Sequence, residues 1–293
     1  MKPTLSKENV IKYILLAAAS FSVFIIFLIF IYLFQRSIPA FEELGWSILS
    51  REYSPASGRY GLGGAIAGSL LVTAGALIIS YPLGIGGGIF LSEIAPVWVR
   101  RMLKPIIEVL AGIPSVIYGF LGAVLLVPFA YNAFDMLQGQ SYFAGGIILG
   151  VMTLPIIISI SDDSLKAVPR DIKDASLALG ATRWITTKKI TFPAASSGIF
   201  AAATLGVGKA IGETMAVLMI ISATTNAPLP WFDFFQAGPT LTALIAGHMG
   251  ESAPGIARST LFAAGVFLFL IVGTLGIITD VMQQRVIKKF KGR

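Results

Sequence analysis

The sequence predicts an all-α integral membrane protein. Of its 293 residues, 55% are hydrophobic and only 13% are charged, and the mean hydropathy is +0.82. A soluble domain carries about 25% charged residues, so this composition is typical of a membrane protein. Apolar runs long enough to cross a bilayer core of ~30 Å recur along the chain. Because lipid offers no partner to backbone polar groups, each run is expected to form a helix.

Six apolar segments are long enough to span the bilayer. They are Ile14–Phe34, Leu62–Leu91, Ile106–Phe129, Phe143–Ile160, Ser197–Ile221 and Ser259–Val281. The first is too long for the apolar core of a cleaved signal peptide, so it is interpreted as a retained span. The second contains Pro82 followed by a glycine-rich run, so we expect it to break, bend or leave the bilayer near its end.

Lysines and arginines are concentrated on one side of these spans. The outer segments contain only Arg36, Arg51, Arg59 and Arg258. The positive-inside rule therefore predicts that both termini lie in the cytoplasm. The net charge of +7 reflects this orientation, and no nucleic-acid partner is expected. The chain has no cysteine, which excludes disulfides and thiolate metal sites, and no other metal site is expected.

The predicted organisation has three parts. Residues 1–61 comprise a cytoplasmic tail, the first span and an outer loop, residues 62–284 form a core of five spans, and residues 285–293 form a basic cytoplasmic tail. Within the core, small residues recur at four-residue spacing, which lets helices approach closely. Such pairs are Gly64 and Gly68, Gly84 and Gly88, Gly146 and Gly150, and Gly208 and Gly212. The alternative is that these glycines reflect only the general abundance of glycine in membrane helices.

A charged stretch, residues 161–194, separates the fourth and fifth spans and is longer than a simple connection. Pro169 suits the first turn of a helix, and Gly180 suits its end. A second short helix is expected to start at Thr182 and to end before Pro193. The first helix places apolar side chains on one face. This stretch is therefore either an amphipathic hairpin resting on lipid or a docking element for a cytoplasmic partner.

The spacing within this stretch favours docking. Asp174-Ala175-Ser176, Gly180 and Ile190-Thr191-Phe192-Pro193 resemble the EAA motif of ABC-importer permeases, which runs Glu-Ala-Ala, three residues, Gly, nine residues, Ile-x-Leu-Pro. Every interval matches, with conservative departures at Asp174, Ser176 and Phe192. The resemblance implies that residues 161–194 form coupling helices that sit in a groove of an ATPase subunit. The residues it assigns to coupling are Asp174, Ala175, Ser176, Gly180, Ile190 and Pro193.

Two further segments resemble PstC-type permeases of phosphate ABC importers, which have a MetI-like fold. Residues 103–119 are similar to the third-span signature of these proteins, and residues 210–217 are similar to the fifth-span signature. The resemblance implies a type I importer core in the inner membrane of a prokaryote. The implied partners are a PstA-type permease, two ATPase subunits that bind ATP and Mg²⁺, and an extracytoplasmic phosphate-binding protein. It also allows a phosphate-regulatory protein.

Lys209 and Glu213 are the charged residues of the fifth predicted span, where unpaired charges cost several kcal/mol. On a helix that starts near Ala195, Lys209 lies roughly 21 Å along the axis, in the outer half, with Glu213 one turn further on the same face. The pair either binds substrate, forms a gating salt bridge or joins helices without touching substrate. We place Lys209, Glu213 and Thr214 on the substrate pathway.

In the first of these roles, Lys209 attracts the anion and Glu213 accepts a hydrogen bond from a phosphate hydroxyl. Sulfate has no such proton at neutral pH, so the carboxylate would repel it. The family usually carries Arg where this chain has Lys209. Lysine offers three donors on a compact charge instead of a planar fork, so the departure weakens the case for a direct ligand.

Three other residues of interest lie in or beside the spans. Glu108, near the cytoplasmic end of the third span, either contacts the pathway or caps a helix end near Arg101 or Lys104, and the second reading is favoured. Pro114 is expected to break or bend the third span. His248 is expected to be an ordinary interfacial residue.

The chain is not expected to be an enzyme. Around Lys209, Ala203 stands where a Walker A motif has its first glycine, and Ala210 stands where it has its Ser or Thr. ATP hydrolysis and its cofactors are therefore expected to belong to partner subunits. Two other functions remain open. One is an ABC permease for another oxyanion such as sulfate or molybdate. The other is an ion-coupled secondary transporter, which would need an inverted repeat and no ATPase.

Overall fold

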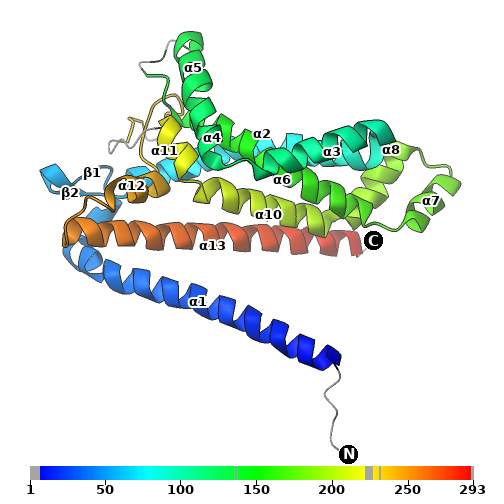
Figure 1. Cartoon of the computed structure of the whole chain (residues 1–293), viewed down its shortest axis with the longest axis horizontal. Coiled ribbons are helices and arrows are strands. Elements are labelled where there is room, and N and C mark those ends of the chain that lie inside the picture. Colours follow the sequence, from blue (N-terminus) through cyan, green and yellow to red (C-terminus); the bar gives the residue numbers. More distant parts are fainter. Residues whose placement is uncertain (1–6, 135, 137, 222–226, 231, 292–293) are drawn as a thin grey trace, which may run out of the picture.

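Long helices that run side by side dominate the structure, a computed structural model that describes residues 7–134, 136, 138–221, 227–230 and 232–291 (Figure 1). Five of its helices are long and apolar enough to cross a membrane, and a bent helix pair can supply a sixth span. The first long helix begins, and the last one ends, toward the end of the bundle that carries the 161–194 stretch (Figure 1). This arrangement agrees with the predicted topology.

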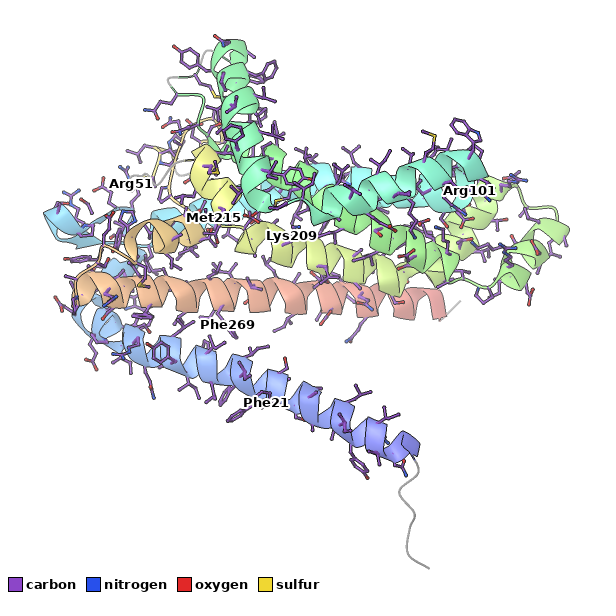
Figure 2. All side chains as sticks on the ribbon, viewed as in Figure 1. Phe21, Arg51, Arg101, Lys209, Met215 and Phe269 are labelled. Atoms are coloured by element: carbon purple, nitrogen blue, oxygen red, sulfur yellow. The ribbon has the colours of Figure 1, made fainter. Side chains whose placement is uncertain are left out.

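The first and last spans, α1 (Lys7–Leu44) and α13 (Ile256–Lys291), pack together near the outer end and diverge toward the cytoplasmic end (Figure 1). The rings of Phe30 and Phe269 lie in contact at a tilt, with centroids 4.9 Å apart. Beyond that contact α1 is uncovered, as at Phe21, which is 64% exposed (Figure 2). The most apolar 18 residues of this helix have a mean hydropathy of 3.0, which suits it to lipid contact.

The centre of the bundle is formed by α2 (Gly63–Ile89) and α6 (Tyr142–Lys166). A Cβ on Gly84 would lie 2.6 Å from the Ile157 side chain, so only glycine permits this approach. The glycine spacing thus predicted a real contact. Of the expected break, bend or exit near the end of this span, no break occurs at Pro82, because α2 continues through it and then passes into a π-helical turn, η3 (Phe90–Ile94).

The third span is interrupted. Helix α3 (Val97–Gly112) ends before Pro114, and a second run follows as α4 (Ser115–Leu121), η4 (Gly122–Leu126) and α5 (Val127–Phe134). The predicted break at Pro114 is confirmed. The predicted span began too early, because the apolar run long enough to cross a membrane is Ser115–Phe134 and α3 buries none of its residues within the chain.

The fifth span is also interrupted, which the sequence did not predict. Helix α10 (Ser196–Gly212) stops where Glu213 adopts an extended backbone, with φ −70° and ψ 129°. A shorter helix, α11 (Met215–Ile221), resumes after Thr214. The expected continuous helix over Ser197–Ile221 is therefore wrong, and Lys209 and Glu213 do not share one helical face.

The stretch between the fourth and fifth spans is shorter than expected, because α6 continues to Lys166. It contains α7 (Arg170–Ala178) and, after Gly180 at φ +84°, one helical run made of α8 (Arg183–Thr186), η5 (Thr187–Thr191) and α9 (Phe192–Ala194). Thr182 caps α8, as predicted. The expected end before Pro193 is wrong, because the helical run passes through the π-helical turn η5 and includes Pro193 in α9. The run bends by 69° into α10.

The outer end of the bundle carries a small hairpin and a short helix. The two strands, β1 (Tyr53–Ser54) and β2 (Arg59–Tyr60), pair in antiparallel fashion beside the 3-10 turns η1 (Gly45–Leu49) and η2 (Pro55–Ser57). Helix α12 (Leu241–His248) lies against them (Figure 1). The His248 ring packs on Tyr53 at 5.5 Å, and its Nδ1 lies 3.1 Å from Leu244 O. His248 thus occupies a packed structural position.

Candidate functional site

Glu213 forms the turn between α10 and α11. Its Oε1 accepts a hydrogen bond from Ala216 N at 3.2 Å, so the carboxylate caps the start of α11. Its backbone oxygen, released from the helical ladder, accepts a hydrogen bond from Thr242 Oγ1 of α12 at 2.9 Å. The break is therefore held by its own side chain and by a residue of another element.

Lys209 lies in the last turn of α10, where the helix dipole favours a cation. Figure 2 places Lys209 and Met215 on either side of the break, between Arg51 at the outer end and Arg101 at the cytoplasmic end. Lys209 is half-buried and makes no ion pair with the described residues. The gating salt bridge with Glu213 that helical spacing suggested is absent from this part of the chain.

A small cavity with a mixed polar and apolar lining adjoins Glu213. Its volume is about 10 Å³, enough for a single water molecule. Hydroxyl groups from α2 and from the start of α12 line it beside the Glu213 carboxylate. These hydroxyls belong to Ser69, Thr73, Thr240 and Thr242. The site thus draws polar groups from three segments far apart in the sequence.

The break at Pro114 is braced by Tyr118, whose hydroxyl donates to Leu110 O at 2.9 Å. Because Pro114 has no N–H, the last carbonyls of α3 lack their helical partner, and the tyrosine supplies one of these bonds. Tyr118 is 8% exposed and joins the central core cluster. The third-span break is therefore also a fixed structural feature.

The two interrupted spans meet. Helices α4 and α11 pack so closely that a Cβ on Gly119 would lie 2.8 Å from the Cα of Ala216. Three residues further on, at the start of η4, Gly122 approaches the Ile220 side chain. Interrupted helices that pack against each other bring backbone polar groups and charged residues into the interior of a membrane protein, where transport proteins bind their substrates.

One face of α10 is uncovered by the residues that the structure describes. Gly208 and Gly212 have nothing within 4 Å of the position a Cβ would take, and Leu205 on the same helix is 55% exposed. Gly208 is therefore not the intrachain packing contact that was expected, whereas Gly212 does mark the end of the helix. The open face includes Lys209.

Glu108 is exposed on α3 and makes no ion pair with the part of the chain that the structure describes. The favoured reading, that it caps a helix end near Lys104, is wrong, since Lys104 instead contacts Asp162 and Asp163 of α6. The other reading, contact with the pathway, stays a prediction.

In the 161–194 stretch, several apolar side chains of α7, α8 and their connection are turned outward. Leu179 is 90% exposed, Trp184 is 60% exposed and Ile172 is 47% exposed. Ser176 Oγ lies 3.0 Å from Thr186 Oγ1 and thereby joins α7 to α8. Asp174 and Ala175 are exposed, whereas Ile190 and Pro193 are half-buried. The hairpin therefore presents an apolar surface that no described part of the chain covers.

Several functional candidates had no clear signal in the sequence. Thr242 falls in an outer segment, where a threonine attracts no attention. Asp162 follows the predicted fourth span and was assigned to a solvated loop, yet it is 1% exposed. The paired residues Glu93 and Lys173 are 80 positions apart. Tyr118 lies next to the predicted break, and this proximity is the one usable hint.

The helical core, the two interrupted spans and the outward-facing loop define a multi-pass membrane transport protein. Residues 84–292 match the family described as binding-protein-dependent transport system inner membrane component, and the chain belongs to that family. It is thus a permease subunit of ABC importers, a family with ATPase and substrate-binding partners.

Curated relatives match over most of the chain. It is 44% identical to the probable ABC transporter permease protein YqgH of Bacillus subtilis, over 72% of this chain and 68% of that protein. It is 34% identical to the phosphate transport system permease protein PstC of Mesorhizobium japonicum, over 87% of this chain and 83% of that protein. The probable PstC of Methanocaldococcus jannaschii is also 34% identical, over 94% and 95%.

Solved structures share the fold. A bacterial alginate ABC transporter in complex with an alginate-bound periplasmic protein superposes with a TM-score of 0.64 at 17% identity, over 97% of this chain and 99% of that one. The MetNI methionine ABC transporter in an inward-facing conformation gives 0.57 at 19% identity, over 84% and 98%. The fold is that of the MetI-like permeases, as the sequence predicted.

Proposed function

We propose that this chain is one of two permease subunits of an ATP-driven importer of inorganic phosphate in the inner membrane. The observation that carries the proposal is the 34% identity to proteins named phosphate transport permeases over most of the chain. The second permease is PstA-type. The other partners are two ATPase subunits, which bind ATP and Mg²⁺, and an extracytoplasmic phosphate-binding protein.

The open face of α10 supports a pathway between the two permeases. Lys209, Gly208 and Gly212 lie on a helix whose free face nothing in the described chain covers, so a second subunit can complete a passage there. Lys209 attracts the anion. Glu213 and Thr214 follow Lys209 along the chain, at the break between α10 and α11. The Glu213 carboxylate accepts a hydrogen bond from a phosphate hydroxyl.

The capping role of Glu213 is compatible with this assignment. One carboxylate oxygen accepts from Ala216 N, and the other has no hydrogen bond among the described residues. A carboxylate has about four lone-pair sites, so it can accept a further bond. A sulfate dianion at the same place would present only acceptors and would be repelled.

The outward apolar surface of α7 and α8 supports docking on an ATPase. Leu179 at 90% exposure and Trp184 at 60% exposure cost free energy in water, so a partner that buries them is favoured. Gly180, at φ +84°, allows the sharp turn between the two helices. ATP hydrolysis is assigned to the partner subunits.

The test is uptake of radiolabelled phosphate by the complex reconstituted into proteoliposomes with its binding protein. We expect uptake to require ATP and to resist a large excess of sulfate. Equal competition by sulfate would remove both the substrate assignment and the role of Glu213. Uptake without ATP would instead support an ion-coupled secondary transporter.

A further inference from the structure

Ion pairs at the cytoplasmic end of the bundle join the coupling hairpin to the membrane helices. We name this group the cytoplasmic ion-pair cluster. It consists of Glu93 in η3, Lys104 in α3, Asp162, Asp163 and Lys166 in α6, and Lys173 in α7. None of these residues belongs to the substrate pathway or to the EAA motif.

Asp162 anchors the cluster. Its side chain is 1% exposed, and a carboxylate so deeply buried costs several kcal/mol unless it is paired. Its Oδ2 accepts hydrogen bonds from Lys166 and, at 3.3 Å, from Lys104. Lys104 also donates to Asp163 at 2.6 Å, and this hydrogen bond raises the pKa of the Lys104 ammonium. Helices α3 and α6 are thereby tied together.

Lys173 connects the coupling hairpin to this assembly. Its Nζ lies 2.7 Å from Glu93 Oε1 and also donates to Leu165 O at 3.3 Å. The two charged side chains are only 19% and 13% exposed, so solvent screens their attraction weakly. One lysine of α7 thus holds both η3 and the end of α6.

From Glu93 the contacts continue toward the interrupted spans. Arg100 Nε donates to Leu91 O at 2.7 Å, which fixes η3 against the start of α3. Helix α3 then runs to the Pro114 break, where Tyr118 ties it to α4. Helix α4 packs on α11 next to Glu213. A continuous series of polar and close-packed contacts therefore links α7 with the candidate pathway.

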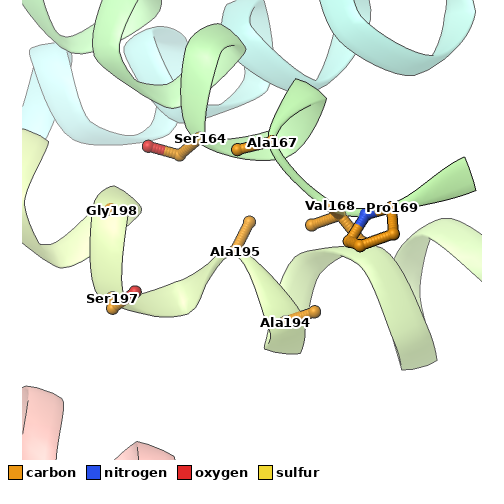
Figure 3. A pocket seen from close by; sticks show the side chains of 8 residues that line it. All are labelled: Ser164, Ala167, Val168, Pro169, Ala194, Ala195, Ser197 and Gly198. Carbon is orange, nitrogen blue, oxygen red and sulfur yellow. The ribbon is translucent and has the colours of Figure 1, made fainter. Parts of the chain in front are cut away.

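The chain itself provides a second route from the hairpin to Lys209. It passes through the 69° bend at Ala195, beside a cavity of about 290 Å³ (Figure 3). The cavity is lined by Ser164, Ala167, Val168, Pro169, Ala194, Ala195, Ser197 and Gly198. Ala195 at the bend is buried in a small apolar cluster with Leu165, Val168 and Ile199, so this route is packed as well, and the ion pair is a separate connection beside it.

We propose that the Lys173–Glu93 ion pair transmits displacement of α7 to η3 and α3, and thereby couples the ATPase to the interrupted spans. Lys173 and Glu93 act as positioning residues and do not touch substrate. This inference rests on the proposed function, because it needs an ATPase that moves α7. The contact between Lys173 and Glu93 links α7 to the third span, although the two residues are 80 positions apart in the sequence.

The test compares Lys173→Met and Glu93→Gln with the wild type in reconstituted proteoliposomes. The measured quantity is the number of phosphate ions imported per ATP hydrolysed, which a merely structural role would leave unchanged. Single residues along such networks change coupling by up to about thirtyfold, and we expect a fall of about tenfold with ATP hydrolysis retained. Lys12→Met, at an exposed lysine of α1, is the matched control.

Charge reversal, Lys173→Glu with Glu93→Lys, is expected to return the ratio to within about threefold of the wild type, because the attraction is restored. Single variants with a wild-type ratio, or a reversal no better than the singles, would overturn the inference. If the wild-type complex imported no phosphate, that result would overturn the proposed function itself, before any variant is compared. The two failures are thus distinguishable.

A second design covers variants that do not assemble. The chain has no cysteine, so Lys173→Cys with Glu93→Cys creates the two thiols needed for a reducible bifunctional crosslinker. We expect the crosslinked complex to import phosphate with a near-normal ratio and the reduced complex to lose about tenfold, in line with the network estimate above. An equal ratio in both states would show that this contact does not transmit the motion.

Discussion

Two spans of this permease are interrupted, and the two breaks are built by different means. In the third span, Pro114 lacks an N–H and holds φ at −57°, so no helix can run through it undisturbed. In the fifth span there is no proline. Glu213 adopts an extended backbone while its own side chain and Thr242 satisfy the freed polar groups.

This difference assigns different properties to the two breaks. At Pro114 one helical hydrogen bond is lost by covalent structure whatever surrounds it, and the break is completed by the extended backbone of Ile113 and Pro114, with ψ of 130° and 137°. The break at Glu213 depends on hydrogen bonds, each worth about 1 kcal/mol, so a ligand or a rearrangement of α12 can change it. The two breaks lie where α4 and α11 pack together, one rigid and one adjustable. The adjustable one carries the charged residues.

The largest expected effect comes from Glu213→Gln. Glutamine keeps an oxygen that can accept from Ala216 N, so the cap remains while the charge is lost. A hydrogen bond to a charged group is worth about 1.5–3 kcal/mol, so phosphate uptake should fall by roughly tenfold or more. Sulfate should begin to compete, because the repulsion is gone. Both are read from uptake into proteoliposomes.

Glu213→Ala serves as the comparison, since it removes the cap as well. Loss of a capping side chain costs about 0.5–2 kcal/mol, so this variant alone should melt at a lower temperature. If Glu213→Gln imported phosphate normally and still rejected sulfate, the carboxylate would be a cap and nothing more.

The contact between the two breaks is tested by Gly119→Ala. The added methyl group would lie 2.8 Å from the Ala216 backbone, so α4 and α11 must separate. Overpacking of this kind costs about 1–3 kcal/mol, which thermal unfolding of the purified complex should detect together with reduced uptake. Gly86→Ala is the control, because nothing lies within 4 Å of its added methyl group. Equal melting of both variants would contradict close packing at the breaks.

The dependence of the fifth-span break on α12 is tested by Thr242→Val. Valine keeps the shape but leaves the Glu213 carbonyl without its partner, at a cost of about 1–3 kcal/mol. We expect a lower melting temperature and a several-fold loss of uptake, with recovery in Thr242→Ser. Thr274→Val removes a hydroxyl bonded only within its own helix and should change neither. Wild-type melting and uptake of Thr242→Val would mean that the break at Glu213 does not depend on α12.

The same contrast explains what the sequence could predict. The spans and the topology follow from apolar length and charge counted segment by segment, and the Pro114 break follows from one residue's chemistry. The Glu213 break was missed because its partner, Thr242, lies 29 residues away in an outer segment. Helical spacing then suggested a Lys209–Glu213 pair that the break prevents. Asp162 was missed because hydropathy ended the fourth span at Ile160, before its last turns.

Tyr118→Phe should have the smallest effect and sharpens the comparison most. It removes the hydroxyl that donates to Leu110 O across the Pro114 break and keeps the ring in the core. Because the missing N–H of Pro114 disfavours a continuous helix whether or not Tyr118 donates, the loss should be limited to one hydrogen bond, about 0.5–1.5 kcal/mol, with uptake within about twofold of wild type. The thermal unfolding temperature and the phosphate uptake of Tyr118→Phe are measured in parallel with those of Thr242→Val. If Tyr118→Phe impaired uptake as much as Thr242→Val, both breaks would depend on hydrogen bonds, and the rigid role of the third span would be lost.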